Sequence, residues 1–228
     1  MPDNESGGRN MVTARLARTL PEQAVLRPAC IRGRIRMTRG IILFGSSGAG
    51  TTTIGREVAR RLGFPHYDLD DYLWRKDTPL PFSATTPREE LKKRLMADID
   101  AHPHFVMSGS MDSYNQPFVP LFDLAVLVHA PADVRVARVE ARESGWFGGR
   151  ILPGGDMHEN HLKFIDGIRR YDTDGSPSRA VHEQWASTLP CPVLRIDGTR
   201  PVEENVVRIL VAYAGAVGSG EIRRENPT

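Results

Sequence analysis

A glycine-rich loop between an apolar run and an amphipathic segment constrains the fold of this chain more than any other feature. The run from Ile41 to Phe44 is short, continuous and followed by glycine, which is typical of a strand buried on both faces of a parallel sheet. Beyond the loop, Ile54, Val58 and Leu62 recur at four-residue spacing. That spacing places one apolar stripe on a helix from about Thr52 to Leu62. The sequence thus predicts a strand, a tight turn and a helix in direct succession.

The same alternation of strands and helices continues to about residue 214. Short apolar runs predict further strands at 64–68, 105–107, 124–129 and 193–196. Helical patterns predict further helices at about 87–99, 131–143, 158–170 and 201–213. The first of these is preceded by a capping-box sequence, Thr86-Pro87-Arg88-Glu89. The alternation predicts a three-layer α/β domain with a parallel sheet and right-handed crossovers.

Composition and charge divide the chain into a leader, a domain and a tail. A content of 40% hydrophobic and 25% charged residues is that of a packed domain, which we place at 40–214 with a lid insertion at about 144–176. Residues 1–39 hold eight arginines and three acidic residues, and we expect a disordered basic leader there. A nucleic-acid arm and a transit peptide are the alternatives for this leader. Residues 215–228 are rich in glycine and charge, and we expect a flexible tail.

Several classes of protein are disfavoured by what the sequence lacks. The longest apolar stretches fall far short of the roughly 20 residues that cross a bilayer, so we expect no membrane partner. Cys30 and Cys191 lie far apart, which supports neither a disulfide framework nor a zinc site and favours a reducing cytoplasm. The net basic charge lies within 1–39 alone, and we expect no nucleic-acid partner for the domain.

The glycine-rich loop nearly matches G-x-x-x-x-G-K-[ST], in which backbone amides surround a polyphosphate. The helix that follows adds free N–H groups and the positive end of its dipole. Thr52 occupies the position of the hydroxyl ligand of Mg²⁺. We therefore expect phosphate binding here, with an ordinary glycine-rich turn as the alternative. The residues expected to bind the phosphates are Gly45, Ser46, Ser47, Gly48, Ala49, Gly50, Thr51, Thr52 and Thr53.

Thr51 departs from this motif because it occupies the position of the lysine. The missing charge-assisted hydrogen bond is worth about 1.5–3 kcal/mol, which weakens nucleotide binding without abolishing it. Phosphoryl transfer needs a cation at the phosphates, so an active enzyme must recruit another one. Arg138 and Arg142, with Arg135, are spaced three and four residues apart on one predicted helix face. Arg138 and Arg142 are our candidate catalytic cations, and a solvated helix face is the alternative.

Two polar clusters follow the second and third predicted strands. Ligands of open α/β sheets bind outside the carboxyl ends of the strands, so carboxylates in the segment 68–71 are well placed to hold a Mg²⁺-bound water or a substrate hydroxyl. Asp70 is our candidate for orienting or deprotonating an attacking hydroxyl, while a helix cap with exposed acids is the alternative. Ser108-Gly109-Ser110 offers backbone amides and hydroxyls to an acceptor, unless it is a simple turn.

With these motifs, residues 40–214 resemble the adenylate kinase and shikimate/gluconate kinase group of small P-loop phosphotransferases. The resemblance implies a P-loop NTPase fold with a parallel five-stranded sheet of order 2-3-1-4-5. It also implies ATP and Mg²⁺ as the donor and closure of a mobile lid over the site.

The resemblance further implies roles for individual residues. Asp68 is implied to lie near the metal and Asp70 on the acceptor, while Ser108-Gly109-Ser110 takes the place of the group's glycine-rich acceptor loop. Arg138 and Arg142 resemble the arginines that precede the lid and touch the ATP phosphates or the adenine.

We therefore expect a cytoplasmic ATP- and Mg²⁺-dependent kinase that moves the γ-phosphate of ATP to a small acceptor. A nucleotide-binding regulatory protein without catalysis, or a slow NTPase, is the alternative, and Thr51 is the feature in its favour. The acidic and hydroxyl groups around the loop favour the kinase because a protein that only binds a nucleotide does not need them.

Overall fold

The strands of the sheet lie where the apolar runs predict them. The computed structural model of the protein describes residues 38–111 and 114–225, so the leader expected at 1–39 lies almost wholly outside the described residues. Five parallel strands form one sheet of order β2-β3-β1-β4-β5, which confirms the expected fold and strand order. The strands are β1 (Arg39–Gly45), β2 (His66–Asp68), β3 (His104–Ser108), β4 (Phe122–His129) and β5 (Val193–Asp197).

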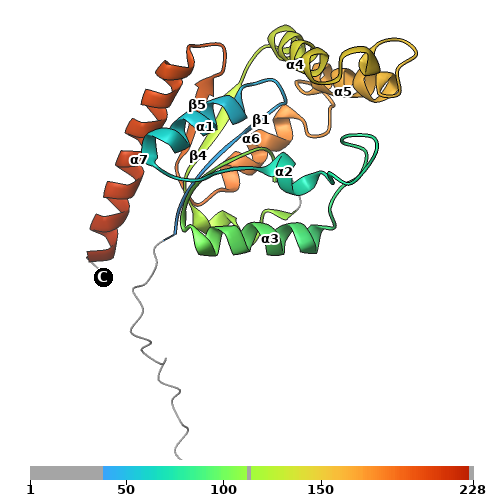
Figure 1. The fold of residues 1–228 in the computed structure, drawn as a ribbon. Coiled ribbons are helices and arrows are strands. Elements are labelled where there is room, and N and C mark those ends of the chain that lie inside the picture. The colour runs from blue at the N-terminus through green and yellow to red at the C-terminus, as the bar shows by residue number, and fades with distance from the viewer. Residues whose placement is uncertain (1–37, 112–113, 226–228) are drawn as a thin grey trace, which may run out of the picture. The chain divides into compact units, whose positions relative to one another are not determined.

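Helices cover both faces of the sheet and its carboxyl edge (Figure 1). They are α1 (Thr51–Leu62), α2 (Leu69–Leu73), α3 (Arg88–Ala101), α4 (Ala132–Phe147), α5 (His158–Arg170), α6 (Arg179–Thr188) and α7 (Val202–Glu225), with short 3₁₀ turns η2 (Val119–Leu121) and η3 (Gly148–Ile151). Helices α1 and α7 pack on one face of the sheet, and α3 and α6 pack on the other. Helices α4 and α5 lie beyond the carboxyl ends of the strands, at the top of Figure 1.

Strand β1 joins the two hydrophobic layers because its side chains alternate between the faces of the sheet. Ile41 and Leu43 pack with α1 and α7, whereas Ile42 and Phe44 pack with α3 and α6. All four side chains are fully buried. Burial of each such side chain stabilises the fold by about 1.5–3 kcal/mol, which holds the end of β1, and with it the loop, in place.

The expected capping box before α3 is wrong. The helix begins at Arg88, Pro87 is its capping residue, and no side chain caps its first turn. Thr85 forms an isolated bridge with Trp74, and the Thr86 amide donates to the Leu73 carbonyl at 2.7 Å. This pairing keeps the chain extended through Thr86, so the helix starts too late for the box.

Other helices differ from expectation mainly in length. Helix α5 has the predicted bounds, whereas α4 extends past Glu143 to Phe147, so the segment expected to be a lid (144–176) begins inside a helix. Helix α7 continues past Tyr213 to Glu225, into the segment where we expect the tail. Helices α2 and α6 were not predicted. Within 38–111 and 114–225, no helix combines the length and the hydropathy that crossing a bilayer requires.

Candidate functional site

The loop between β1 and α1 needs glycine at two positions for geometric reasons. Gly48 and Gly50 have φ values of 82° and 106°, in the left-handed region that side chains disfavour. A Cβ atom on Gly48 would lie 2.4 Å from the Arg135 carbonyl oxygen of α4. The loop backbone therefore lies directly against α4, and a side chain at position 48 would not fit between them.

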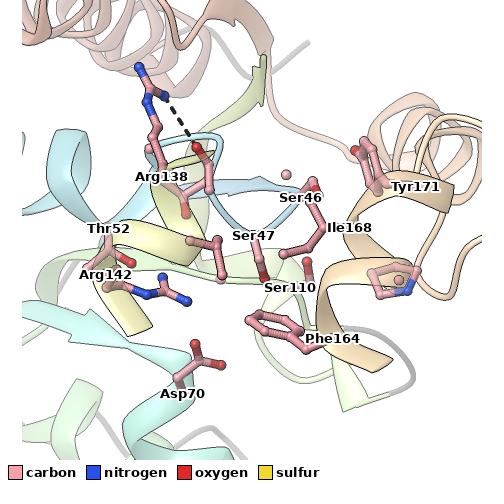
Figure 2. Close-up of a pocket in the computed structure, with 18 of the residues that line it drawn as sticks. Ser46, Ser47, Thr52, Asp70, Ser110, Arg138, Arg142, Phe164, Ile168 and Tyr171 are labelled. Carbon is pink, nitrogen blue, oxygen red and sulfur yellow. Dashed lines mark hydrogen bonds between the residues drawn. The ribbon is translucent and has the colours of Figure 1, made fainter. Parts of the chain in front are cut away.

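A cavity of about 630 Å³ opens at the carboxyl edge of the sheet, between the loop and α5 (Figure 2). Of the residues predicted to form the site, all but Ala49 and Ser108 line it. The structure thus brings together the loop, Asp68 at the end of β2, Asp70 in α2, Gly109-Ser110 after β3 and the arginines of α4. Ala49 is buried beneath the loop, and its amide donates to the Ser46 carbonyl at 3.0 Å.

Ser108 does not face the cavity, which corrects its expected role in acceptor binding. Its side chain is fully buried, and its hydroxyl donates to the Thr51 carbonyl at 3.1 Å. Its oxygen also lies 2.9 Å from Nε2 of His66, and a Cβ on Gly55 would approach it to 2.2 Å. Ser108 therefore supports the first turn of α1 from below, and its hydroxyl is not available to a substrate.

Asp68 and Asp70 stand together at the entrance to α2, where both line the cavity. Asp68 caps this short helix by accepting from the Asp70 amide at 3.2 Å, so it is both a cap and a cavity residue. Desolvation raises the pKa of the Asp70 carboxyl, and the neighbouring Asp68 carboxylate raises it further. Arg142 opposes this rise, which places a positive charge within electrostatic reach of Asp70.

The two candidate arginines of α4 are held differently. Arg138 donates to the carbonyls of Gly48, Ala49 and Gly198 at 3.3, 3.4 and 3.0 Å, which ties the loop to the turn after β5. The Arg142 guanidinium lies 5.0 Å from the centre of the Trp146 ring and points toward Asp70 (Figure 2). Arg138 is therefore held by backbone carbonyls, whereas Arg142 lies against an aromatic ring.

Arg135 is neither a cavity residue nor part of a solvated face. It is fully buried and donates to the Ala130 carbonyl, the Ile168 carbonyl and the Asp172 carboxylate at 2.8, 3.0 and 2.7 Å. Its guanidinium also lies 4.9 Å from the centre of the Tyr171 ring. Arg135 thus holds the carboxyl end of α5 against α4.

Sequence reasoning missed a chain of hydrogen-bonding groups at the far end of the cavity. The Ser110 hydroxyl lies 2.9 Å from Nε2 of His182, and the Tyr171 hydroxyl lies 2.9 Å from its Nδ1. His182 comes from α6 and is 4% exposed, while burial raises the pKa of Tyr171 to about 12. The available signal was Ser178, whose hydroxyl caps α6 by accepting from Val181, but no pattern in the sequence predicts the contacts of His182.

The oxygen atoms at the loop end of the cavity suit a hard divalent cation. Thr52 offers a hydroxyl and Asp68 a carboxylate, which are ligand types that Mg²⁺ accepts together with phosphate oxygens and water. In the described part of the chain, no cluster of three or more histidine, cysteine, aspartate or glutamate residues is placed to hold a metal unaided.

Comparison with known proteins gives matches along most of the domain. The chain is 34% identical over 176 residues to the uncharacterized protein YqaC of Bacillus subtilis, covering 76% of this chain and 97% of that protein. It is 30% identical over 114 residues to a cytidylate kinase of Methanothermobacter thermautotrophicus, covering 46% and 68%. A gluconokinase structure from Sinorhizobium meliloti aligns with a TM-score of 0.46 at 16% identity, covering 82% and 98%. No family model matches the sequence.

Proposed function

Since the chain belongs to the P-loop small-molecule kinases, we propose that it transfers the γ-phosphoryl group of ATP to a hydroxyl or phosphate of a small acceptor. One observation carries this proposal: the loop, two acids, Gly109-Ser110 and two arginines come from separate segments of the chain and line one cavity. These segments meet at the carboxyl edge of a parallel sheet, and this edge is where α/β enzymes bind their ligands.

The loop end of the cavity suits the donor. Successive amides from Gly45 to Thr52, and the amino end of α1, favour the negative charge of a triphosphate. Thr52 and Asp68 would hold Mg²⁺, which when bound neutralises charge on the phosphate oxygens. Arg138 keeps the loop in shape, and Arg142 is placed to offset charge that develops near Asp70.

The other end suits the acceptor. The raised pKa of Asp70 makes its carboxylate a better proton acceptor than an ordinary aspartate, as a group that removes a proton from an attacking hydroxyl requires. The Gly109 amide and the Ser110 hydroxyl are the groups we assign to orienting that acceptor. Phe164 and Ile168 of α5 cover the cavity, and further closure of the lid (144–176) would exclude water, which competes as an acceptor.

Two other functions are favoured by Thr51 alone. A protein that lacks the lysine ammonium can bind a nucleotide as a regulatory signal, or hydrolyse ATP slowly with water as the acceptor. These functions differ from the kinase in one respect, which is that neither forms a phosphorylated small molecule.

The test is transfer of label from γ-labelled ATP with Mg²⁺ to a panel of nucleotides, sugar acids and cyclitols. We expect a labelled product with at least one acceptor, and we expect Thr52→Ala and Asp70→Ala each to remove most of this turnover. Arg88→Ala, at an exposed site at the start of α3, is the matched control. Phosphate release that is independent of every acceptor would favour the slow NTPase, and wild-type transfer in both variants would contradict the assigned roles.

A further inference from the structure

We propose that Lys163 of α5 supplies the phosphate-binding ammonium group that is missing at Thr51. This inference rests on the proposed function because it concerns the same nucleotide site. It differs from the expectation that an arginine of α4 takes this place. It predicts that the positive charge reaches the terminal phosphates from the helix opposite the loop.

The need for such a group follows from the loop itself. Thr51 lines the cavity at the position where the motif has lysine, and a threonine hydroxyl carries no charge. The backbone amides can bind phosphate oxygens, but they leave most of the charge of a triphosphate unbalanced. A mobile point charge on a long side chain is the usual remedy, and lysine provides it with four methylene groups.

Three basic side chains line the cavity in the part of the chain that the structure describes, and they are not equally available. Arg138 is engaged by three backbone carbonyls, and Arg142 lies against Trp146 and near Asp70. Lys163 is exposed and makes no hydrogen bond or ion pair with any described residue. Its ammonium group is therefore the cation that a ligand can engage without breaking a contact.

The position of α5 directs Lys163 toward the site. Phe164 and Ile168 of this helix, and Tyr171 directly after it, face the cavity across from the loop in Figure 2. Lys163 lines the same cavity, and so does Gly167, one helical turn further along. A Cβ atom on Gly167 would meet no other atom within 4 Å, so the lysine side chain has open space beside it.

Arg135 keeps this helix in place while leaving Lys163 free to move. It binds the Ile168 carbonyl and the Asp172 carboxylate, at the carboxyl end of α5, whereas Lys163 belongs to the amino-terminal half. Val136 and Val139 of α4 also pack with Ile165 between the two helices. The lysine is thus carried by a supported helix and does not depend on a loose loop.

The test is titration calorimetry of ATP with Mg²⁺, and of AMP by displacement, on the full chain. Because one charge-assisted hydrogen bond is lost, Lys163→Met should weaken ATP binding about 10- to 100-fold and AMP binding by less than about twofold. Lys163→Arg should keep most of the affinity. Lys93→Met, an exposed lysine on α3 that is remote from the cavity lining, is the matched control and should bind as wild type. Wild-type ATP affinity in Lys163→Met would overturn the proposal.

A rescue experiment tests whether the two positions serve one purpose. Adding Thr51→Lys to Lys163→Met should restore most of the lost ATP affinity, since the motif lysine would again reach the phosphates. The proposal is wrong if Thr51→Lys alone binds ATP at least as well as wild type while the double variant binds ATP as weakly as Lys163→Met. Because these titrations need no acceptor, Lys163-dependent binding without any label transfer would refute the kinase function and leave this inference intact.

Discussion

The two walls of the cavity are built by different means. The loop wall consists largely of backbone from one continuous segment, 45–53, and it is held by Arg138 and by the buried Ser108 beneath it. The opposite wall consists of side chains from α5, supported by Arg135 of α4, with His182 of α6 linking Ser110 to Tyr171. The first wall offers backbone amides, which suit the phosphates that all nucleoside triphosphates share, whereas the second offers side chains, which can vary with the ligand.

This difference determines what each wall tolerates. A backbone site depends on dihedral angles and close approach, so a single added carbon disrupts it. A side-chain site depends on what each side chain contacts, so a substitution there can change ligand binding while the fold is retained.

The largest effect is expected from alanine at a glycine of each wall. Gly48→Ala should cost at least about 1–3 kcal/mol of folding stability, because it forces a left-handed residue against the Arg135 carbonyl, and it should also impair ATP binding. Gly167→Ala, inside α5 with open space around it, should stabilise the protein by about 0.5–1 kcal/mol. Denaturant unfolding measures both, and equal effects at the two glycines would remove the distinction between the walls.

The next effect separates two serines of one short segment. Ser108→Ala removes the Ser108 hydroxyl from the Thr51 carbonyl and from Nε2 of His66 in a partly buried site, which should cost about 1–3 kcal/mol of stability. Ser110 borders the cavity, so Ser110→Ala should raise the KM for the acceptor, in addition to the stability lost because Nε2 of His182 loses its partner. If Ser108→Ala raised that KM with unchanged stability, the supporting role of Ser108 would be wrong.

A smaller effect is expected at the buried histidine behind Ser110. His182→Phe keeps a ring in the core but removes both nitrogen contacts, so the Ser110 and Tyr171 hydroxyls lose their orientation. We expect a rise of about 5- to 10-fold in the KM for the acceptor, an order that follows from one neutral hydrogen bond, with unchanged ATP affinity. A loss of ATP affinity alone would show that His182 serves the donor end instead.

The smallest effect concerns the stability of the protein as a function of pH. Because the folded state raises the pKa of Asp70, its ionised carboxylate disfavours folding at neutral pH, and that penalty disappears below its ordinary pKa of 3.8. Asp70→Asn should therefore unfold at a slightly higher temperature than wild type at pH 7, with a gain that shrinks as the pH falls toward 3.8. A gain that grows on acidification would contradict the direction of this pKa shift.

The loop wall could be predicted from the sequence because its residues are neighbours in the chain. Asp70 and Ser110 could also be predicted as site residues, because the carboxyl ends of parallel strands meet at one edge of the sheet. The five strands themselves could be predicted from apolar runs. The order of the strands came from the resemblance to a family, which rested on the loop together with the acids at 68–70, Ser108-Gly109-Ser110 and the two arginines. Both inferences depend on the spacing of residues along the sequence, which can be analysed without knowledge of tertiary contacts.

The α5 wall could not be predicted in the same way. The helix itself was expected at 158–170, but the direction in which Lys163 and Phe164 point depends on how Arg135 docks it, and a buried arginine has the same sequence pattern as an exposed one. The predicted role of Ser108 in acceptor binding was wrong for a related reason. The sequence at the end of a strand does not show whether a hydroxyl faces the ligand or the neighbouring helix.

We propose that the loop binds a nucleoside triphosphate although it lacks the motif lysine. Thermal unfolding of the full chain with and without ATP and Mg²⁺ tests it most directly. At an ATP concentration about 100 times the Kd, binding should stabilise the folded state by about 2.7 kcal/mol and raise the Tm by about 5–10 °C. The Gly48→Ala variant should show little of this rise. An unchanged Tm of the wild-type protein at millimolar ATP and Mg²⁺ would show that the loop does not bind the nucleotide.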